Sequence, residues 1–471
     1  MRSSPSTTDT RREAVLRTCA VIGVVITCTA ILGLGALQYA MPEKLRCCWG
    51  FNWRGAEHFR QVMFGGHLPT LSPVVFVAWF RIFLIASWLG YAVAVVAAIR
   101  GGILKPKAIL GVVVPLAVLL AVFCPASLSC DAYGYIAYAR MQVVYGLNPY
   151  ADTPRILLAH ADPTVKFLVW DIPTPYGPVW TVFSIMVVWL LRSVGLWWQL
   201  VAMKLVAAGG LIATALAGRI IADRLSPGKG NLTLLAIGLN PLFLIEGPGS
   251  GHNDLAMMAL ALIGAALVLN KRYILGDLLI GCSVGVKYVT APILPWLIVE
   301  RLRGKRPREI ALLALLAIVI VLGPTILCFA PFWQGADTFA GLGSRWSQPQ
   351  TPADRDHSSA TLGVGPTEPG TVKRFSGFSS AIARQWPLMI VFLILSLWVY
   401  LRGSEGSWLT AWALLSWCVI VWATGVRFPW YLVWPWAAAL TRWDRPHIGI
   451  SSVCFCAAVF LMMMYTIPVG M

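Results

Sequence analysis

Residues 108–135 read AILGVVVPLAVLLAVFCPASLSCDAYGY. The apolar run 108–128 is long enough to cross the hydrocarbon core of a bilayer as one helix. Asp131, Tyr133 and Tyr135 follow it almost at once, so the carboxylate is predicted to emerge at a membrane boundary. Ionisable side chains in such places usually mark function. The fold and the candidate site are therefore both predicted from this stretch and the polar residues that follow it, as far as Pro178.

The rest of the chain has the composition of a membrane protein. It holds 471 residues, of which 58% are hydrophobic and 12% charged, with a mean hydropathy of +0.73. Soluble globular chains carry about twice as many charged residues. We predict one all-α polytopic integral membrane domain, residues 1–471, with about 11–13 transmembrane helices. The candidate spans are 16–41, 73–99, 108–128, 199–222, 232–249, 253–270, 309–333, 385–401, 407–425, 429–441 and 446–466.

The formal charge of +17 is spread over short loops between the spans. Clusters such as Lys271–Arg272 mark cytoplasmic loops in membrane proteins, whereas nucleic-acid binding calls for one basic stripe. We therefore expect membrane lipids and no nucleic acid as partners. The eleven cysteines show no metal-binding spacing, and no nucleotide-binding loop is visible. No metal and no cofactor are expected.

The charge rule also predicts the topology. Arg2, Arg11, Arg12 and Arg17, at the start of the chain, place the N-terminus in the cytoplasm and Asp131 on the outer face of the cell membrane. Two stretches are ambiguous, 178–191 and 273–299. If each crosses the membrane once, three basic residues near 219–229 fall outside. If 178–191 dips in and returns, and 273–299 breaks at Lys287 into two half-helices, every basic loop is cytoplasmic. We favour the second arrangement, which makes 334–384 a long outer loop.

Asp131 has two interpretations. It is a general base or cation ligand at the outer face, or it caps the helix that follows, a position that aspartate favours. Arg140 also has two interpretations. Its guanidinium matches the geometry of a bound phosphate, and it could equally contact lipid headgroups. The tyrosines around them favour a function for Asp131. Tyr176, in the turn Pro175–Pro178, is a further candidate for lining the site.

Three more positions carry polar groups in apolar surroundings. His252, Asn253 and Asp254 follow a glycine-rich turn and precede an apolar helix; they suit a sugar or phosphate site, although Asn253 and Asp254 also suit helix capping. Lys287 lies in the middle of an apolar stretch with no acidic neighbour, so a phosphate would be a natural counter-charge. Arg427 precedes an aromatic cluster and is a candidate for contact with lipid phosphate.

Together these segments resemble the bacterial polyprenol-phosphate-mannose-dependent mannosyltransferases of the GT-C superfamily, above all those that make α-1,6 linkages; the GT87 family is a near neighbour. The resemblance spans roughly residues 128–300, while loop 334–384 departs from it. The matching segments, in order, are Asp131-x-Tyr133-x-Tyr135, Gly146-Leu147-Asn148-Pro149-Tyr150, Pro175-Tyr176-Gly177-Pro178, His252-Asn253-Asp254 and Val286-Lys287.

The resemblance implies a GT-C-like fold and a reaction. The donor would be a polyprenyl-phosphate sugar, with mannose favoured, and the acceptor a lipid-linked or glycan hydroxyl. Asp131 would act as base in an inverting direct displacement, within an outer-face catalytic loop at 131–178. The donor phosphate would be bound by Lys287, Arg140, Arg427 and His252. The sugar or acceptor would be bound by Tyr133, Tyr135, Tyr176, Asn253 and Asp254.

Two other functions fit a polytopic chain. A transporter or flippase of lipid-linked sugars would show internal repeats with paired broken helices, and none is visible here. An O-antigen ligase or polymerase would be expected to have arginine-rich loops in place of the Asp131 cluster. Both remain alternatives to glycosyl transfer.

Overall fold

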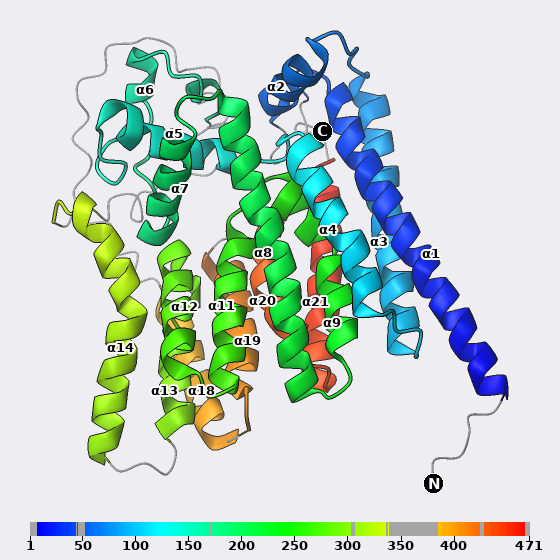
Figure 1. Cartoon of the computed structure of the whole chain (residues 1–471), viewed down its shortest axis with the longest axis vertical. Helices are drawn as coiled ribbons and strands as arrows, with labels where there is room; N and C mark the ends of the chain where they lie inside the picture. The colour runs from blue at the N-terminus through cyan, green and yellow to red at the C-terminus, as the bar shows by residue number, and fades with distance from the viewer. Residues whose placement is uncertain are drawn as a thin grey trace.

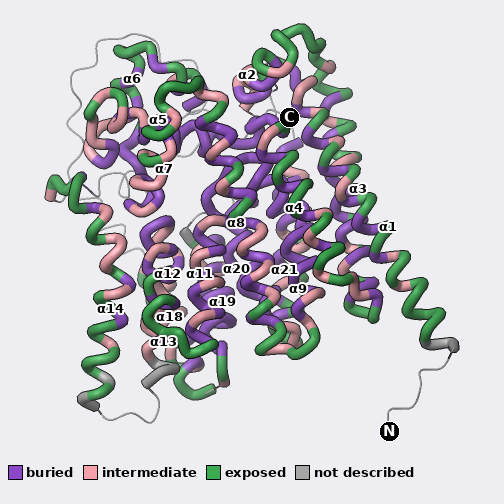
Figure 2. The backbone as a smooth tube through the Cα atoms, viewed as in Figure 1, coloured by how far each residue is buried: buried purple, intermediate pink, exposed green. Residues whose placement is uncertain are grey.

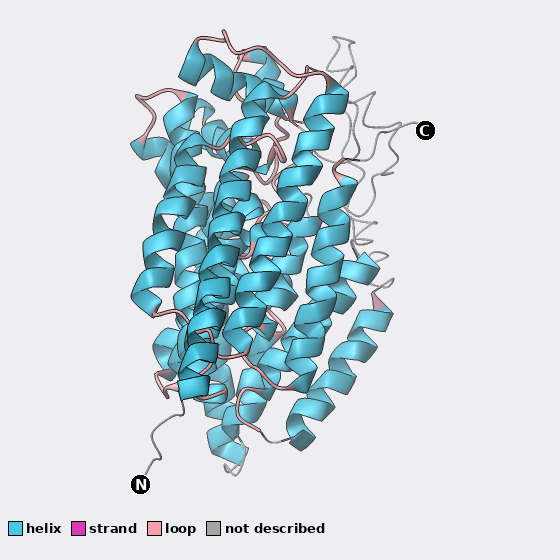
Figure 3. Cartoon of the chain, turned by 90° about the vertical axis from the view of Figure 1, so that its right-hand side faces the viewer, coloured by secondary structure: helices cyan, strands magenta, loops and turns pink. Residues whose placement is uncertain are grey.

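The computed structural model describes residues 7–43, 45, 52–168, 171–302, 307–335, 338, 385–402, 404–423 and 428–466. Helices and short helical turns supply all the regular structure of this part of the chain (Figure 3). Most helices run along the long axis of one bundle with two distinct ends (Figure 1). We call the end that carries α2 (Trp53–Phe64) and α5 (Asp131–Tyr145) the polar end. The opposite end, where α1 (Thr7–Leu37) begins, is the basic end.

The first two long helices lie side by side at one edge of the bundle (Figure 1). They are α1, which ends in the turn η1 (Gln38–Ala40), and α3 (Pro73–Ile99). A Cβ added to Gly23 would lie 2.6 Å from the carbonyl oxygen of Gly90, so only small residues allow this approach. Next, α4 (Pro106–Phe123) climbs back to the polar end and delivers the chain to Asp131.

The segment after Asp131 stays near the polar end. It comprises α5, α6 (Ile156–Ala159), η2 (Val165–Phe167) and α7 (Pro178–Leu190). The N–H of Gly177 donates to the carbonyl of Val286, 3.1 Å away. From there, inside the bundle, α7 rises to the polar end, where α8 (Leu196–Leu225) begins (Figure 1). Stretch 178–191 is thus a short helix that begins inside the bundle and ends at the polar end.

Broken helices fill the middle of the bundle. α8 leads to the basic end and is followed by α9 (Gly230–Gly238), α10 (Pro241–Leu244), the π-helical turn η3 (Ile245–Gly249) and α11 (Asp254–Leu269). After them, α12 (Tyr273–Val286) ends at Lys287, which has extended backbone angles of φ −145° and ψ 130°. The turn η4 (Tyr288–Thr290) and α13 (Ile293–Leu302) then lead back to the basic end. The break in 273–299 therefore falls at the lysine where the sequence predicts it.

The last third of the described chain completes the bundle. Its elements are α14 (Pro307–Phe329), η5 (Ala330–Phe332), α18 (Trp386–Arg402), α19 (Ser407–Ala423), η7 (Pro429–Leu432), α20 (Val433–Ala439) and α21 (Arg445–Met464). Burial is deepest around α8, α11 and α20, whereas α1 and α14 expose apolar side chains along their length (Figure 2). Exposed apolar helix faces are suited to contact with lipid.

Six helices among the described residues are long and apolar enough to cross a membrane, and the bent pair 230–249 makes a seventh. That is fewer full-length spans than the predicted 11–13. The difference arises because six further apolar segments form helices of only 10–17 residues, several of which meet at breaks inside the bundle. The predicted all-helical, multi-pass membrane architecture is confirmed.

The basic loops share one end of the bundle. The connections α3–α4, α8–α9 and α11–α12 all lie at the basic end, with the start of α1 (Figure 1). Of the predicted outer loop 334–384, only Gln334, Gly335 and Thr338 are among the described residues. Arg427 also lies outside the described residues.

Candidate active site

Asp131 is the first residue of α5, and its side chain is turned into the bundle. Cys130 occupies the N-cap position, and the backbone N–H of Asp131 donates to Oγ of Ser129 at 3.1 Å. The carboxylate oxygen Oδ2 lies 3.3 Å from Nδ1 of His252 and 3.5 Å from the hydroxyl of Tyr135. Asp131 is only 6% exposed. This carboxylate therefore belongs to a buried polar cluster, which favours the functional interpretation over helix capping.

His252 lies between two carboxylates. Its Nδ1 faces Asp131, and its Nε2 lies 3.4 Å from Oε2 of Glu246. The imidazole stacks on the indole of Trp430, with ring centroids 4.2 Å apart and the planes inclined by 20°. His252 is 1% exposed and belongs to the connection 250–253, outside the membrane-spanning helices.

The two carboxylates decide the protonation of His252. Burial lowers the pKa of the imidazole, because it disfavours the charged form. Asp131 and Glu246 outweigh burial and raise the pKa of His252 to about 9. The two carboxylates that face the ring therefore favour the imidazolium form of His252.

Glu246 was missed by the sequence predictions. It lies in the π-helical turn η3, is 0% exposed, and its Oε1 accepts a hydrogen bond from the hydroxyl of Tyr465 at 2.9 Å. A glutamate in the apolar run LFLIEGP, close to a predicted membrane boundary, was the available signal. Tyr465, at the far end of the chain, offered none.

Lys287 is the centre of a second cluster. Its ammonium donates to both carboxylate oxygens of Asp254, each at 2.7 Å. The indole N–H of Trp434 donates to Oδ1 of the same carboxylate at 2.5 Å. The ammonium also lies 5.5 Å from the ring centroid of Tyr431 and 5.8 Å from that of Trp434. Asp254 is thus the acidic partner of Lys287, 33 residues away in the sequence.

Tyr135 and Asn253 lie between the two clusters. The backbone N–H of Asn253 donates to the hydroxyl of Tyr135 at 3.4 Å, and this hydroxyl faces Asp131. Asn253 is 0% exposed, and its side-chain amide has no hydrogen-bond partner among the described residues. A buried amide without partners is costly. It is the kind of group that a hydroxyl-rich ligand would satisfy.

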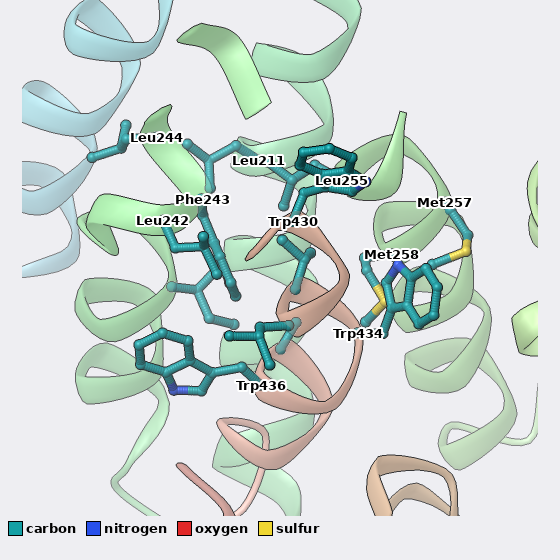
Figure 4. Close-up of a cluster of buried hydrophobic side chains, with 14 of the residues drawn as sticks. Leu211, Leu242, Phe243, Leu244, Leu255, Met257, Met258, Trp430, Trp434 and Trp436 are labelled. Atoms are coloured by element: carbon teal, nitrogen blue, oxygen red, sulfur yellow. The ribbon is translucent and has the colours of Figure 1, made fainter. Parts of the chain in front are cut away.

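Aromatic side chains form the walls of the site. Tyr176 meets Tyr135 edge-on, with centroids 4.7 Å apart, and Trp180 does the same at 5.1 Å. On the other side, Trp430 and Trp434 project from η7 and α20 toward α11, where Leu255 and Met258 pack against them (Figure 4). These contacts fix the rings that hold the polar groups in place.

Two of the predicted site residues lie apart from these clusters. Arg140 makes an ion pair with Asp162, Nε to Oδ2 at 2.8 Å, and so ties α5 to the following loop. Burial raises the pKa of Asp162, but hydrogen bonds, first from Thr164 and then from Arg140, hold it below its usual value. Tyr133 stacks on Phe167 with centroids 4.0 Å apart. The structure therefore brings together Asp131, His252, Asn253, Asp254, Lys287, Tyr135 and Tyr176, and places Arg140 and Tyr133 toward the loop 146–177.

The assembled groups are suited to proton transfer and to stabilising negative charge. Asp131 offers a carboxylate, while His252 and Lys287 offer cations; preorganised cations of this kind stabilise a developing anion. No group of three or more His, Cys, Asp or Glu residues in the described part of the chain could hold a metal ion.

Known proteins similar to this chain share one activity. Residues 21–303 match the family described as alpha-(1->6)-mannopyranosyltransferase, N-terminal domain. The chain is 28% identical over 446 residues to alpha-(1->6)-mannopyranosyltransferase A of Mycobacterium tuberculosis, covering 88% of this chain and 78% of the relative. The protein of the same name from Corynebacterium glutamicum is 28% identical over 198 residues, 42% of this chain and 38% of the relative. No solved structure matches the chain.

Proposed function

Because this chain belongs to the alpha-(1->6)-mannopyranosyltransferase family, we propose that it moves mannose from a polyprenyl-phosphate donor to a lipid-linked or glycan hydroxyl. Its family and its apolar helices make the protein a multi-pass membrane glycosyltransferase that transfers mannose. The donor, the acceptor, the chemical mechanism and the side of the membrane are the proposal.

The observation that carries the proposal is the meeting of Asp131, His252 and Lys287 in one buried region. His252 contacts Asp131, and Asn253 and Asp254 link this contact to Lys287 within three residues of chain. A base and two cations are what a displacement at a sugar phosphate needs. The base receives a proton from the acceptor, and the cations stabilise the phosphate as it leaves.

The reaction would proceed in one displacement. The acceptor hydroxyl attacks the anomeric carbon of mannose while Asp131 receives its proton. The new C–O bond forms as the bond from that carbon to the phosphate oxygen breaks, and the electron pair leaves with the polyprenyl phosphate. Attack opposite to the leaving group inverts the anomeric configuration.

Lys287 would gain a second partner during this reaction. Its ammonium is bound to Asp254 in this structure, so a donor phosphate would share it with that carboxylate. Asp254 is also held by Trp434 and would stay in place. Because the ammonium carries three donors, it can serve the carboxylate and a phosphate oxygen together.

We place the reaction on the outer face of the membrane. The charge rule assigns the basic end to the cytoplasm, and α5, which begins with Asp131, lies at the opposite, polar end (Figure 1). A donor held in the bilayer by its polyprenyl tail would present its sugar at this depth.

Transfer by the purified protein tests the proposal. The full chain in lipid nanodiscs is incubated with radiolabelled polyprenyl-phosphate mannose and a short α-1,6-mannoside, and the product is read by chromatography. We expect labelled product from this donor, and none when GDP-mannose replaces it. Transfer from GDP-mannose alone would contradict the proposed donor. Lack of transfer from every lipid-phosphate sugar would contradict the proposal as a whole.

A further inference from the structure

The C-terminal end of α21 reaches into the centre of the molecule. Tyr465, just past the end of this helix, is 2% exposed, and its hydroxyl donates to Oε1 of Glu246. This tyrosine lies more than 150 residues beyond the matched region 21–303. A segment distant in sequence thus contacts the group that faces His252.

Glu246 is held in a defined orientation. One carboxylate oxygen receives the Tyr465 hydroxyl, and the other lies 3.4 Å from Nε2 of His252. The backbone carbonyl of Glu246 also accepts from the N–H of His252, at 3.1 Å. Glu246 and His252 are therefore joined by a backbone hydrogen bond and by an ion-pair contact between their side chains.

The end of α21 is itself anchored. Arg81, on α3, donates from Nε to the hydroxyl of Thr466 and from its terminal nitrogen to the carbonyl of Thr466, both at 2.9 Å. These bonds hold the residue next to Tyr465. The contacts Arg81–Thr466 and Tyr465–Glu246–His252–Asp131 therefore link α3 and α21 to the candidate base.

Burying a charged glutamate costs free energy unless the carboxylate is paired with a cation. Glu246 has His252 as its cationic partner, and no Lys or Arg among the described residues pairs with it. The groups that face His252 are Asp131 from α5, Glu246 from η3 and the ring of Trp430 from η7. The second carboxylate therefore acts on the imidazole, and through it on Asp131.

We infer that Glu246 and Tyr465 are positioning residues for the transfer reaction: they orient His252 so that Nδ1 faces Asp131, and keep that nitrogen protonated. This inference rests on the proposed function, in which Asp131 is the base. Neither residue needs to touch the substrate. Their effect is to fix the direction and charge of the imidazolium beside the reacting carboxylate.

The two residues contribute differently, which gives each its own signature. Glu246→Gln removes the negative charge that keeps His252 protonated, so the imidazolium is lost at a lower pH. Turnover should fall about tenfold or more. The alkaline limit, meaning the pH above which kcat declines, should move down by about one pH unit or more. Tyr465→Phe keeps the charge and removes one orienting bond. It should lower kcat several-fold, with little change in the pH profile or in the donor KM.

The experiment measures kcat and donor KM between pH 6 and 10 for the full chain in nanodiscs. Matched controls lose similar groups elsewhere. Tyr91→Phe removes a buried hydroxyl that donates to the carbonyl of Ala236, and Glu405→Gln breaks the ion pair with Arg224. Both controls should behave as the wild type does. Glu246→Asp, which restores the charge, should recover the alkaline limit.

Two results would overturn the inference. One is a folded Glu246→Gln protein with the wild-type pH profile; the other is a Tyr465→Phe protein whose kcat matches that of Tyr91→Phe. Should Glu246→Gln fail to fold, the Tyr465→Phe comparison still decides.

A readout without turnover separates this inference from the proposed function. The chain has six histidines, so an NMR titration of ¹⁵N-histidine protein can be assigned with His252→Gln. The inference expects His252 to titrate well above its ordinary pKa in the wild type and lower in Glu246→Gln. Equal titration in both proteins would refute it, whatever the substrate proves to be.

Discussion

The two polar clusters of this site differ in how their charges are balanced. Lys287 meets Asp254 one to one, with two short contacts of 2.7 Å. His252 meets two carboxylates, Asp131 and Glu246, at the longer distances of 3.3 and 3.4 Å. With all groups ionised, the first cluster is neutral and the second carries one excess negative charge.

This difference separates the two roles in the proposed reaction. A carboxylate that shares its cation with a second acid keeps basic character, as Asp131 must if it is to receive a proton. A lysine that is fully paired and surrounded by aromatic rings is a fixed cation, suited to holding a phosphate. Each of the following predictions would sharpen this division of roles or break it.

The largest effect is expected for Asp131→Asn. The amide keeps the shape of the side chain and cannot receive the proton of the acceptor, so kcat should fall by about 10²–10⁴-fold or more. Steady-state transfer of labelled mannose measures this loss. Folding should be preserved, because the substitution removes charge from a cluster that has it in excess. Turnover within a few-fold of the wild type would remove Asp131 as the base.

A smaller effect is expected for Lys287→Met. Loss of a charged hydrogen bond to the phosphate costs about 1.5–3 kcal/mol, which weakens donor binding about 10–100-fold. The same change leaves Asp254 buried without its cation, and breaking such a pair costs about 3–5 kcal/mol of stability. Thermal unfolding in detergent should show this loss.

The double variant Lys287→Met, Asp254→Asn serves as the control for that prediction. It removes both charges, so much of the lost stability should return while donor binding stays weak. Recovery of donor binding together with stability would show that the pair Lys287–Asp254 is structural and does not bind phosphate.

The pH dependence of stability should reveal the His252 cluster. The folded state raises the pKa of His252 to about 9 from the ordinary value near 6.5. Its contribution to stability is therefore fully present below about pH 6.5 and is lost as the pH rises through about 9. Unfolding temperatures measured from pH 6 to 10 should decline over this window. The decline should be smaller in His252→Gln; an unchanged decline would contradict the assignment.

The smallest effect on chemistry is expected for Arg140→Gln. Because Arg140 pairs with Asp162, its loss should loosen the loop 146–177 and cost about 1 kcal/mol. Donor binding should stay within a few-fold of the wild-type value. A drop in donor affinity as large as that of Lys287→Met would instead show that Arg140 binds the donor phosphate, as the sequence predicts.

The sequence was most informative where local pattern determines structure. Runs of apolar residues predicted a helical membrane protein, and a lysine within such a run predicted the break at Lys287. The family was also recognised correctly, because its segments lie close to the polar residues that interrupt the helices. By length and composition, six or seven of the described helical segments suffice to cross a membrane, against the predicted 11–13, because six further apolar helices have only 10–17 residues.

Pairings between distant segments were beyond the sequence. Asp254 was considered as a sugar ligand or helix cap, and the structure shows it as the partner of Lys287. Arg140 was assigned to phosphate, yet it lies beside Asp162. Tyr465 reaches Glu246 across 219 positions of chain. Such contacts depend on how helices pack in space, and no spacing rule in the sequence encodes them.

Equilibrium binding of the donor tests the division of roles most directly. The affinity of the full chain in nanodiscs for polyprenyl-phosphate mannose is measured without acceptor, for the wild type, Asp131→Asn and Lys287→Met. Our account predicts that Asp131→Asn binds the donor as tightly as the wild type, while Lys287→Met binds it about 10–100-fold more weakly. Normal affinity in Lys287→Met, or a comparable loss in Asp131→Asn, would contradict the account.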